Sequence, residues 1–183
     1  MITIYIFLAS SIVEFEWERK ELSAFVGRLN RAYVPREVYV ELTVCEDLSN
    51  AMARGRKQDE YNALIRASRH FILLVGKEIG DYSLEEFNTA LEAYRATGFP
   101  RLHLFRRESL EKAEVTQSVH EFFARLEAEQ LPDICFTSIE TVMVALAEAL
   151  CQDPLIGGDF IKCDGYLEVD GKKVFTIRPT KTN

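Results

Sequence analysis

The stretch HFILLVGKEIGDYSLEEFNTALEAY, residues 70–94, decides the fold predicted for this chain of 183 residues. Residues 71–75 are apolar without polar alternation, which is typical of a strand in a parallel sheet covered on both faces. Gly76 and Gly80 permit the tight loop that follows. An amphipathic helix comes next, so the stretch supplies the strand, loop and helix of half a βαβ unit.

Two adjacent glutamates open that helix and face different sides of it. Ser83 is predicted as the N-cap, and Glu86 three residues later completes a capping-box pattern. At about 100° per residue, Glu85 faces water and Glu86 lies at the rim of an apolar stripe formed by Leu84, Phe87, Ala90, Leu91 and Tyr94. Ligands of open α/β sheets bind at the carboxyl ends of the strands, beside helix N-termini. Glu86 therefore either touches a ligand there or only caps its helix.

Composition and charge exclude several classes of partner. The formal net charge of −7 argues against nucleic acid or an anionic membrane as the main partner. No segment approaches the roughly 18 apolar residues of a membrane span. The four cysteines lack CxxC spacing, and the three histidines lack companions at metal-ligand spacing. We therefore expect reduced thiols, a cytoplasmic protein and no metal site.

Five apolar runs alternate with five helical patterns over the first 150 residues. The predicted strands are residues 2–9, 38–44, 71–75, 102–105 and 134–136. Four of the predicted helices cover about residues 11–30, 83–96, 119–131 and 138–150, and another ends just before residue 70. This alternation predicts a flavodoxin-like α/β fold, with a five-stranded parallel sheet of order 2-1-3-4-5 and helices on both faces.

A domain boundary is predicted after residue 153. Pro154 and the pair Gly157-Gly158 interrupt the pattern, and beyond them two strand-like runs flank Asp170-Gly171, a strong β-hairpin signal. We therefore assign residues 1–153 to the α/β domain and residues 154–183 to a linker and hairpin. Because a two-stranded ribbon is not stable alone in water, it is expected to pack on the domain, dimerise or begin a further domain of a longer protein.

Polar residues follow the first predicted strand. Ser10 and Ser11 end it, and Ser11 and Glu14 have capping-box spacing. Glu18 falls on the apolar stripe of the first helix, with Arg19 beside that stripe. A lone carboxylate in that position would be costly, so Glu18 and Arg19 either form a partly buried pair or contact a ligand.

The second strand is followed by a polar loop, residues 45–57. It carries three cations near its end: Arg54, Arg56 and Lys57. The loop is either a flap whose cations meet phosphates or a solvated connection.

The motifs of several enzyme classes are missing from the sequence. No GxGxxG follows the first strand, and neither a Walker lysine motif nor a GxSxG elbow occurs. A rim carboxylate, paired serines and a cationic loop remain. This set suits cleavage at an anomeric carbon, where a fixed carboxylate can stabilise an oxocarbenium-like state, hold ribose hydroxyls or attack as a nucleophile.

Two patches of the sequence carry a family resemblance. IYIFLASSIVEFEWERKEL, residues 4–22, and GRKQDEYNALIRASRHFILLVGKEIGDYSLEEFNTALEAY, residues 55–94, resemble the TIR-like domains at the front of bacterial defence and NLR-like proteins. The resemblance spans about residues 1–150. It implies a TIR-like fold, NAD+ as a substrate with no cofactor, and homo-oligomers formed through TIR–TIR contacts.

The resemblance also implies roles for single residues. Glu86 matches the catalytic glutamate of NAD-cleaving TIR domains, with Glu85 as the fallback, and Ser10 and Ser11 match the ligand-contacting turn. The flexible BB loop of the family falls on residues 45–57, whose cations would engage the pyrophosphate. The remaining members of the implied binding set are Glu18, Arg19, Tyr82 and Ser83.

One departure from the family leaves the nicotinamide-stacking aromatic open. Many TIR domains have Trp-Cys between the serine and the glutamate, where this chain has Leu84-Glu85. Three aromatic residues are therefore candidates for the stacking role: Phe15, Trp17 and Tyr82.

Three functions stay open at this point. The first is an NAD+ glycohydrolase of bacterial antiphage defence, activated by oligomerisation and releasing nicotinamide with ADP-ribose or a cyclic form. The second is a non-catalytic TIR scaffold that only self-associates, with Glu86 as a helix cap. The third is a nucleoside deoxyribosyltransferase-like enzyme, whose family also begins with an Ile-Tyr-Leu-Ala strand, uses a glutamate nucleophile and acts on free nucleosides.

Overall fold

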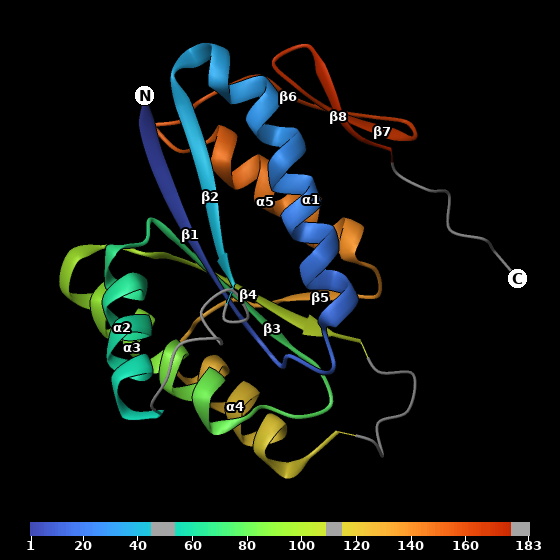
Figure 1. Ribbon diagram of the computed structural model, residues 1–183. Helices are drawn as coiled ribbons and strands as arrows, with labels where there is room; N and C mark the ends of the chain where they lie inside the picture. Colours follow the sequence, from blue (N-terminus) through green and yellow to red (C-terminus); the bar gives the residue numbers. More distant parts are fainter. Residues whose placement is uncertain (45–53, 109–114, 177–183) are drawn as a thin grey trace, which may run out of the picture. The chain divides into compact units, whose positions relative to one another are not determined.

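A computed structural model describes residues 1–44, 54–108 and 115–176 of the chain. Its central feature is a five-stranded sheet in the order β2-β1-β3-β4-β5 (Figure 1). The strands are β1 (Ile2–Ser10), β2 (Val38–Val44), β3 (His70–Val75), β4 (Arg101–Arg107) and β5 (Ile134–Phe136). β3 pairs in parallel with β1 and β4, and β4 pairs in parallel with β5. The predicted fold class and strand order are therefore confirmed.

A helix follows each strand of this sheet. The helices are α1 (Glu16–Tyr33), α2 (Arg54–Ala67), α3 (Asp81–Thr97), α4 (Gln117–Ala128) and α5 (Ile139–Cys151), and a short 3-10 helix, η1 (Val34–Arg36), precedes β2. The alternation of strand and helix is the one that the sequence predicts.

Among the predicted boundaries that are wrong, three bear on the candidate site. α1 begins at Glu16, five residues after the predicted start. α3 begins at Asp81 with Gly80 as its N-cap, so Ser83 lies inside the first turn and does not cap the helix. α2 begins at Arg54, which places the three cations at the end of the predicted loop in a helix. Residues 45–53 of that loop lie outside the described residues.

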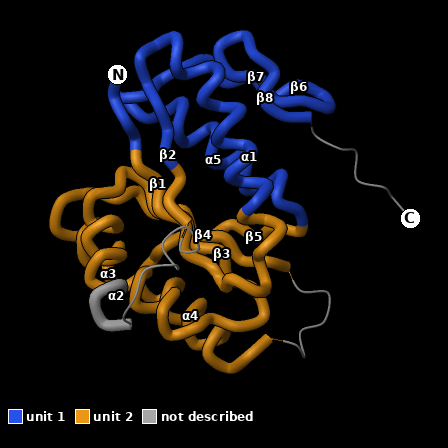
Figure 2. Tube along the Cα trace, viewed as in Figure 1, with its two compact units in different colours: residues 1–4, 20–41, 138–183 blue, residues 5–19, 42–137 orange. Residues whose placement is uncertain are grey.

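The chain divides into two compact units (Figure 2). Unit 1 comprises residues 1–4, 20–41 and 138–183, and unit 2 comprises residues 5–19 and 42–137. The domain boundary placed after residue 153 stays a prediction.

Unit 2 has its own apolar core. Strands β1 and β3 contribute Phe7 and Phe71, whose rings stack with centroids 6.0 Å apart. Helices α3 and α4 meet edge to face through Phe87 and Phe122, with centroids 5.0 Å apart. Further members of this buried cluster are Ala9, Ile65, Leu73, Val75, Ala90, Leu91, Leu104, Val119 and Leu126. Helices α2, α3 and α4 therefore cover one apolar layer of strands within this unit.

Unit 1 contains a second, antiparallel sheet. Its strands are β6 (Phe160–Cys163), β7 (Tyr166–Val169) and β8 (Lys172–Thr176). The predicted hairpin is confirmed, since β7 and β8 flank Asp170 and Gly171, both with positive φ (50° and 71°) as its tight turn requires. The sequence prediction missed β6, although Gly165, the end of a second Asp-Gly pair, marks the turn that joins it to β7.

Within this unit, helix α1 contacts both the antiparallel sheet and strand β2. Its Phe25 meets Phe175 of β8 edge to face, with ring centroids 6.1 Å apart. Farther along, the Asn30 side-chain amide donates to the carbonyl of Val40 at 2.8 Å and accepts from the Val40 N–H at 2.7 Å. These contacts anchor α1 to both the hairpin and β2 within unit 1.

Candidate active site

The candidate site lies in unit 2, where the parallel strands end. Ser10 pairs in register with Leu74 near the end of β3, and Arg107 at the end of β4 pairs with Phe136 of β5. Ser10 is 6% exposed, and its Oγ atom has no hydrogen-bond partner among the described residues. A buried hydroxyl is costly without a partner, so this atom is suited to meet a ligand.

The turn after β1 forms only half of the predicted capping box. The Ser11 Oγ atom accepts from the backbone N–H of Glu14 at 3.3 Å. The Glu14 side chain does not return to the helix start. Both of its carboxylate oxygens accept from the backbone N–H of Lys77, at 3.0 and 3.2 Å. A contact between segments 63 residues apart thus replaces the local one.

Glu18 of helix α1 is paired with an arginine of strand β4. It forms an ion pair with Arg107 of β4, whose guanidinium also lies 4.3 Å from the ring centroid of Phe15 and 3.8 Å from the Glu14 carboxylate. Arg19, next to Glu18, is buried. Glu18 is partly buried and pairs with Arg107, a partner that the sequence did not indicate.

The three aromatic candidates differ in accessibility. Phe15 is buried, and its ring packs against Phe136 with centroids 6.3 Å apart. Trp17 and Tyr82 are 56% and 63% exposed. Arg107 and Phe136 contact the Phe15 ring, whereas the rings of the other two candidates, Trp17 and Tyr82, are at the surface.

The two glutamates of α3 occupy opposite environments. Glu86 is 3% exposed, deeper than the rim position predicted for it. Glu85 is exposed and accepts from the side-chain amide of Asn62 of α2 at 3.3 Å. Thr89, one turn after Glu85, donates to the same Asn62 side chain at 3.1 Å. Glu85 therefore lies at the surface contact between α2 and α3, whereas Glu86 lies inside the unit.

The cations proposed to bind pyrophosphate are placed only by their backbone. Arg54, Arg56 and Lys57 belong to the first turn of α2. Their side chains, and residues 45–53 before them, lie outside the described residues.

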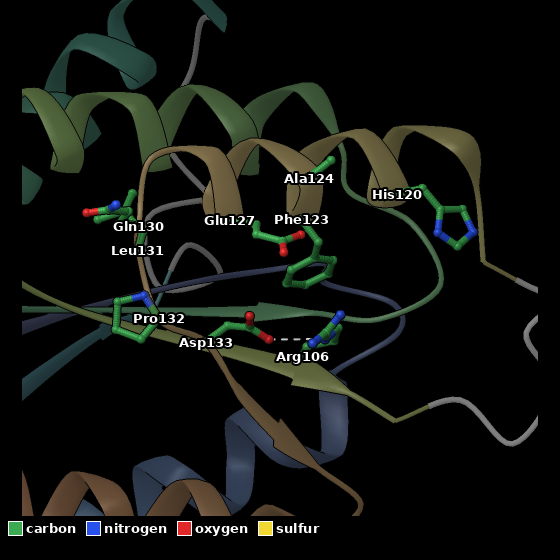
Figure 3. A pocket seen from close by; sticks show the side chains of 9 residues that line it. All are labelled: Arg106, His120, Phe123, Ala124, Glu127, Gln130, Leu131, Pro132 and Asp133. Carbon is green, nitrogen blue, oxygen red and sulfur yellow. Dashed lines mark ion pairs between the residues drawn. The ribbon is translucent and has the colours of Figure 1, made fainter.

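A separate groove of about 710 Å³ opens along α4 (Figure 3). In it, Arg106 Nε lies 3.0 Å from an oxygen of Asp133, and its guanidinium lies 4.5 Å from the ring centroid of Phe123. His120 stands at the far end of α4 from Asp133 (Figure 3). No predicted site residue whose side chain the structure describes lines this groove.

The described residues offer neither a metal-ligand cluster nor a membrane-spanning helix. They contain no group of three or more His, Cys, Asp or Glu side chains arranged to hold a metal ion. No described helix combines the length and the apolar character needed to cross a membrane.

Comparison with known proteins finds similar structures but no matching family. No protein-family model matches the sequence, and no curated protein matches it. One similar solved structure is the CMP N-glycosidase BcmB of Clostridium botulinum, at 14% identity and a TM-score of 0.48, over 79% of this chain and 98% of that one. Another is the RPS4 and RRS1 TIR domain heterodimer, at 10% identity and a TM-score of 0.46, over 81% of this chain and 96% of that one.

Proposed function

We propose that this protein is an NAD+ glycohydrolase in which Glu86 is the catalytic carboxylate. The observation that carries the proposal is the burial of Glu86, next in sequence to the exposed Glu85. Burial disfavours a charged carboxylate, and a buried ionisable side chain beside a ligand cleft is a candidate for a functional role. The buried hydroxyl of Ser10 in the same unit supports a ligand site where β1 ends.

In the proposed reaction, Glu86 holds the nicotinamide ribose and stabilises the positive charge that develops at its anomeric carbon. The bond between this carbon and the nicotinamide nitrogen breaks, and its electron pair neutralises the pyridinium ring. Water then adds to the anomeric carbon and loses a proton, which gives ADP-ribose and neutral nicotinamide. Ser10 and Ser11 present hydrogen-bond donors to the ligand, and Trp17 or Tyr82 stacks on nicotinamide.

The resemblance to TIR-like domains supplies the wider setting of the proposal. It implies activation by homo-oligomerisation, a role in bacterial antiphage defence, and a cyclic ADP-ribose product as an alternative to the linear one. Arg54, Arg56 and Lys57 would engage the pyrophosphate. Assays therefore need conditions that bring several copies of the chain together.

The test is nicotinamide release from NAD+ by the wild type, Glu86→Gln and Glu85→Gln, at high protein concentration or on a crowded support. Removing the charge that stabilises the cation is expected to lower turnover by at least ~100-fold in Glu86→Gln. Glu85→Gln is the matched control, expected to keep wild-type turnover. Thermal melting of all three proteins checks that the variants are folded.

Two outcomes would replace this proposal. A wild type that assembles but leaves NAD+ intact would favour the self-associating scaffold. Turnover of free nucleosides in the same assay, with NAD+ untouched, would favour the deoxyribosyltransferase-like alternative.

A further inference from the structure

Glu14, in the turn after β1, binds the loop that precedes α3 through its carboxylate. Both segments belong to unit 2. The two oxygens of Glu14 lie 3.0 and 3.2 Å from the backbone nitrogen of Lys77, so this N–H is bound by both. Only 15% of the Glu14 side chain is exposed, which limits competition from water for this hydrogen bond.

Gly76, the residue before Lys77, has no side chain and so leaves space for the Glu14 carboxylate. A Cβ atom built on Gly76 would lie 1.8 Å from Glu14 Oε1 and 2.3 Å from Cδ, far inside any real contact distance. The backbone of Gly76 does not have the positive φ that favours glycine. A side chain at position 76 would therefore displace the Glu14 carboxylate from its place beside Lys77.

Lys77 is also held through its carbonyl group. The carbonyl of Lys77 accepts from the backbone N–H of Thr116, the N-cap of α4, at 2.9 Å. The backbone N–H of Glu14 in turn donates to Ser11 Oγ at 3.3 Å. A continuous series of hydrogen bonds thus runs from Ser11 through Glu14 to the loop that leads into α3.

We propose that Glu14 is a positioning residue, which clamps Lys77 so that the start of α3 and its Glu86 are held at a fixed place relative to the Ser10-Ser11 turn. This inference rests on the glycohydrolase proposed above. Residues 76–80 connect β3 to α3, so movement of this loop moves the turn that carries Glu86. The clamp acts on the geometry of the transition state, and its loss lowers kcat more than it raises KM.

The test compares four single variants and one double variant. Glu14→Ala removes the clamp, and Gly76→Ala displaces the carboxylate while leaving Glu14 in place. Glu14→Gln keeps an acceptor oxygen and is the conservative rescue. Gly80→Ser is the matched control, because its side chain enters open space in the same loop and serine is a favoured N-cap.

Two readouts are measured on the full chain: exchange of the Lys77 amide hydrogen by NMR, and kcat and KM for nicotinamide release. We expect Glu14→Ala and Gly76→Ala to speed Lys77 exchange and to lower kcat by on the order of tenfold or more, with KM nearly unchanged. Glu14→Gln should retain most of kcat, and Gly80→Ser should match the wild type. In the double variant, Gly76→Ala should add nothing to Glu14→Ala, because the colliding carboxylate is gone.

The outcomes separate this inference from the function on which it rests. Loss of turnover in Glu86→Gln with wild-type kcat in Glu14→Ala and Gly76→Ala overturns the positioning role and leaves the glycohydrolase intact. Unchanged Lys77 exchange in both variants shows that the clamp does not hold the loop. A wild type without NAD+ turnover overturns both proposals.

Discussion

His70 Nδ1 lies 2.9 Å from His103 Nε2, and the two rings stack with centroids 5.2 Å apart. The residues come from the neighbouring strands β3 and β4. One nitrogen must donate and the other accept, so a single proton lies between the rings when both are neutral. Protonation of the acceptor would place two N–H groups face to face.

The first prediction concerns pH. Burial, and then the charge of Arg101, lower the pKa of His103 from 6.5 to about 4. Between these two pKa values, His103 is protonated in the unfolded chain but neutral in the folded chain. The free energy of unfolding therefore decreases as the pH falls from 6.5 towards 4. By pH 5 the loss is about 2 kcal/mol. Urea unfolding at pH 7 and pH 5 should show this loss in the wild type and a smaller one in His103→Gln; equal losses would contradict it.

The second prediction separates stability from function at Ser10. Because its buried Oγ has no partner among the described residues, Ser10→Ala should leave the free energy of unfolding unchanged or slightly raised. Nicotinamide release should fall. Ser68→Ala is the control: its equally buried hydroxyl donates to the Leu64 carbonyl at 2.8 Å, and its loss should cost about 1 kcal/mol. A clear loss of stability in Ser10→Ala would mean that the hydroxyl is used within the fold.

The third prediction compares two arginines. Arg107, whose side chain is 27% exposed, pairs with Glu18 and covers the Phe15 ring, so Arg107→Ala should cost about 2 kcal/mol. Arg95, 58% exposed, pairs with Glu129 at 2.8 Å, and Arg95→Ala should cost less than about 1 kcal/mol. Chemical denaturation of the two variants measures the difference. Equal costs would show that Arg107 contributes no more than a surface pair.

The fourth prediction compares alanine substitutions at two glycines. Gly27 is exposed within α1, and a Cβ there meets nothing within 4 Å, so Gly27→Ala should stabilise the protein by up to about 1 kcal/mol. Gly171 has a φ of 71° in the β7–β8 turn, and Gly171→Ala should destabilise it by about 1 kcal/mol. Thermal melts should shift in opposite directions. A shift in the same direction would contradict the backbone argument.

The sheet could be predicted from the sequence because its strands are buried. β3 was predicted to within one residue, since an unbroken apolar run has few alternatives, and β2 and β5 match their predicted ranges. The strand β6 was missed because its four residues, Phe160–Cys163, are too few to show a strand period. This strand is defined by its antiparallel pairing with β7. In the sequence, the Asp-Gly turn before β7 is the local sign of that pairing.

The candidate site was less predictable because its contacts are distant in sequence. Capping-box spacing predicts that Glu14 returns to its own helix, whereas the structure shows it bound to Lys77. Glu18 likewise pairs with Arg107, 89 residues away. At α3 the N-cap is Gly80, and Ser83 follows inside the first turn. Local spacing identifies residues that can bond, and tertiary structure decides which partner each one takes.

The paired hydrogen bonds between Asn30 and Val40 have a consequence for aggregation. β2 is the first strand in the order of the sheet, so one side of it has no neighbouring strand among the described residues. The N–H and carbonyl of one residue in a parallel strand point to the same side, and both of these groups in Val40 bind Asn30. The side chain occupies the place where an incoming strand from another molecule would bond. Strand addition is therefore blocked at this point of the edge.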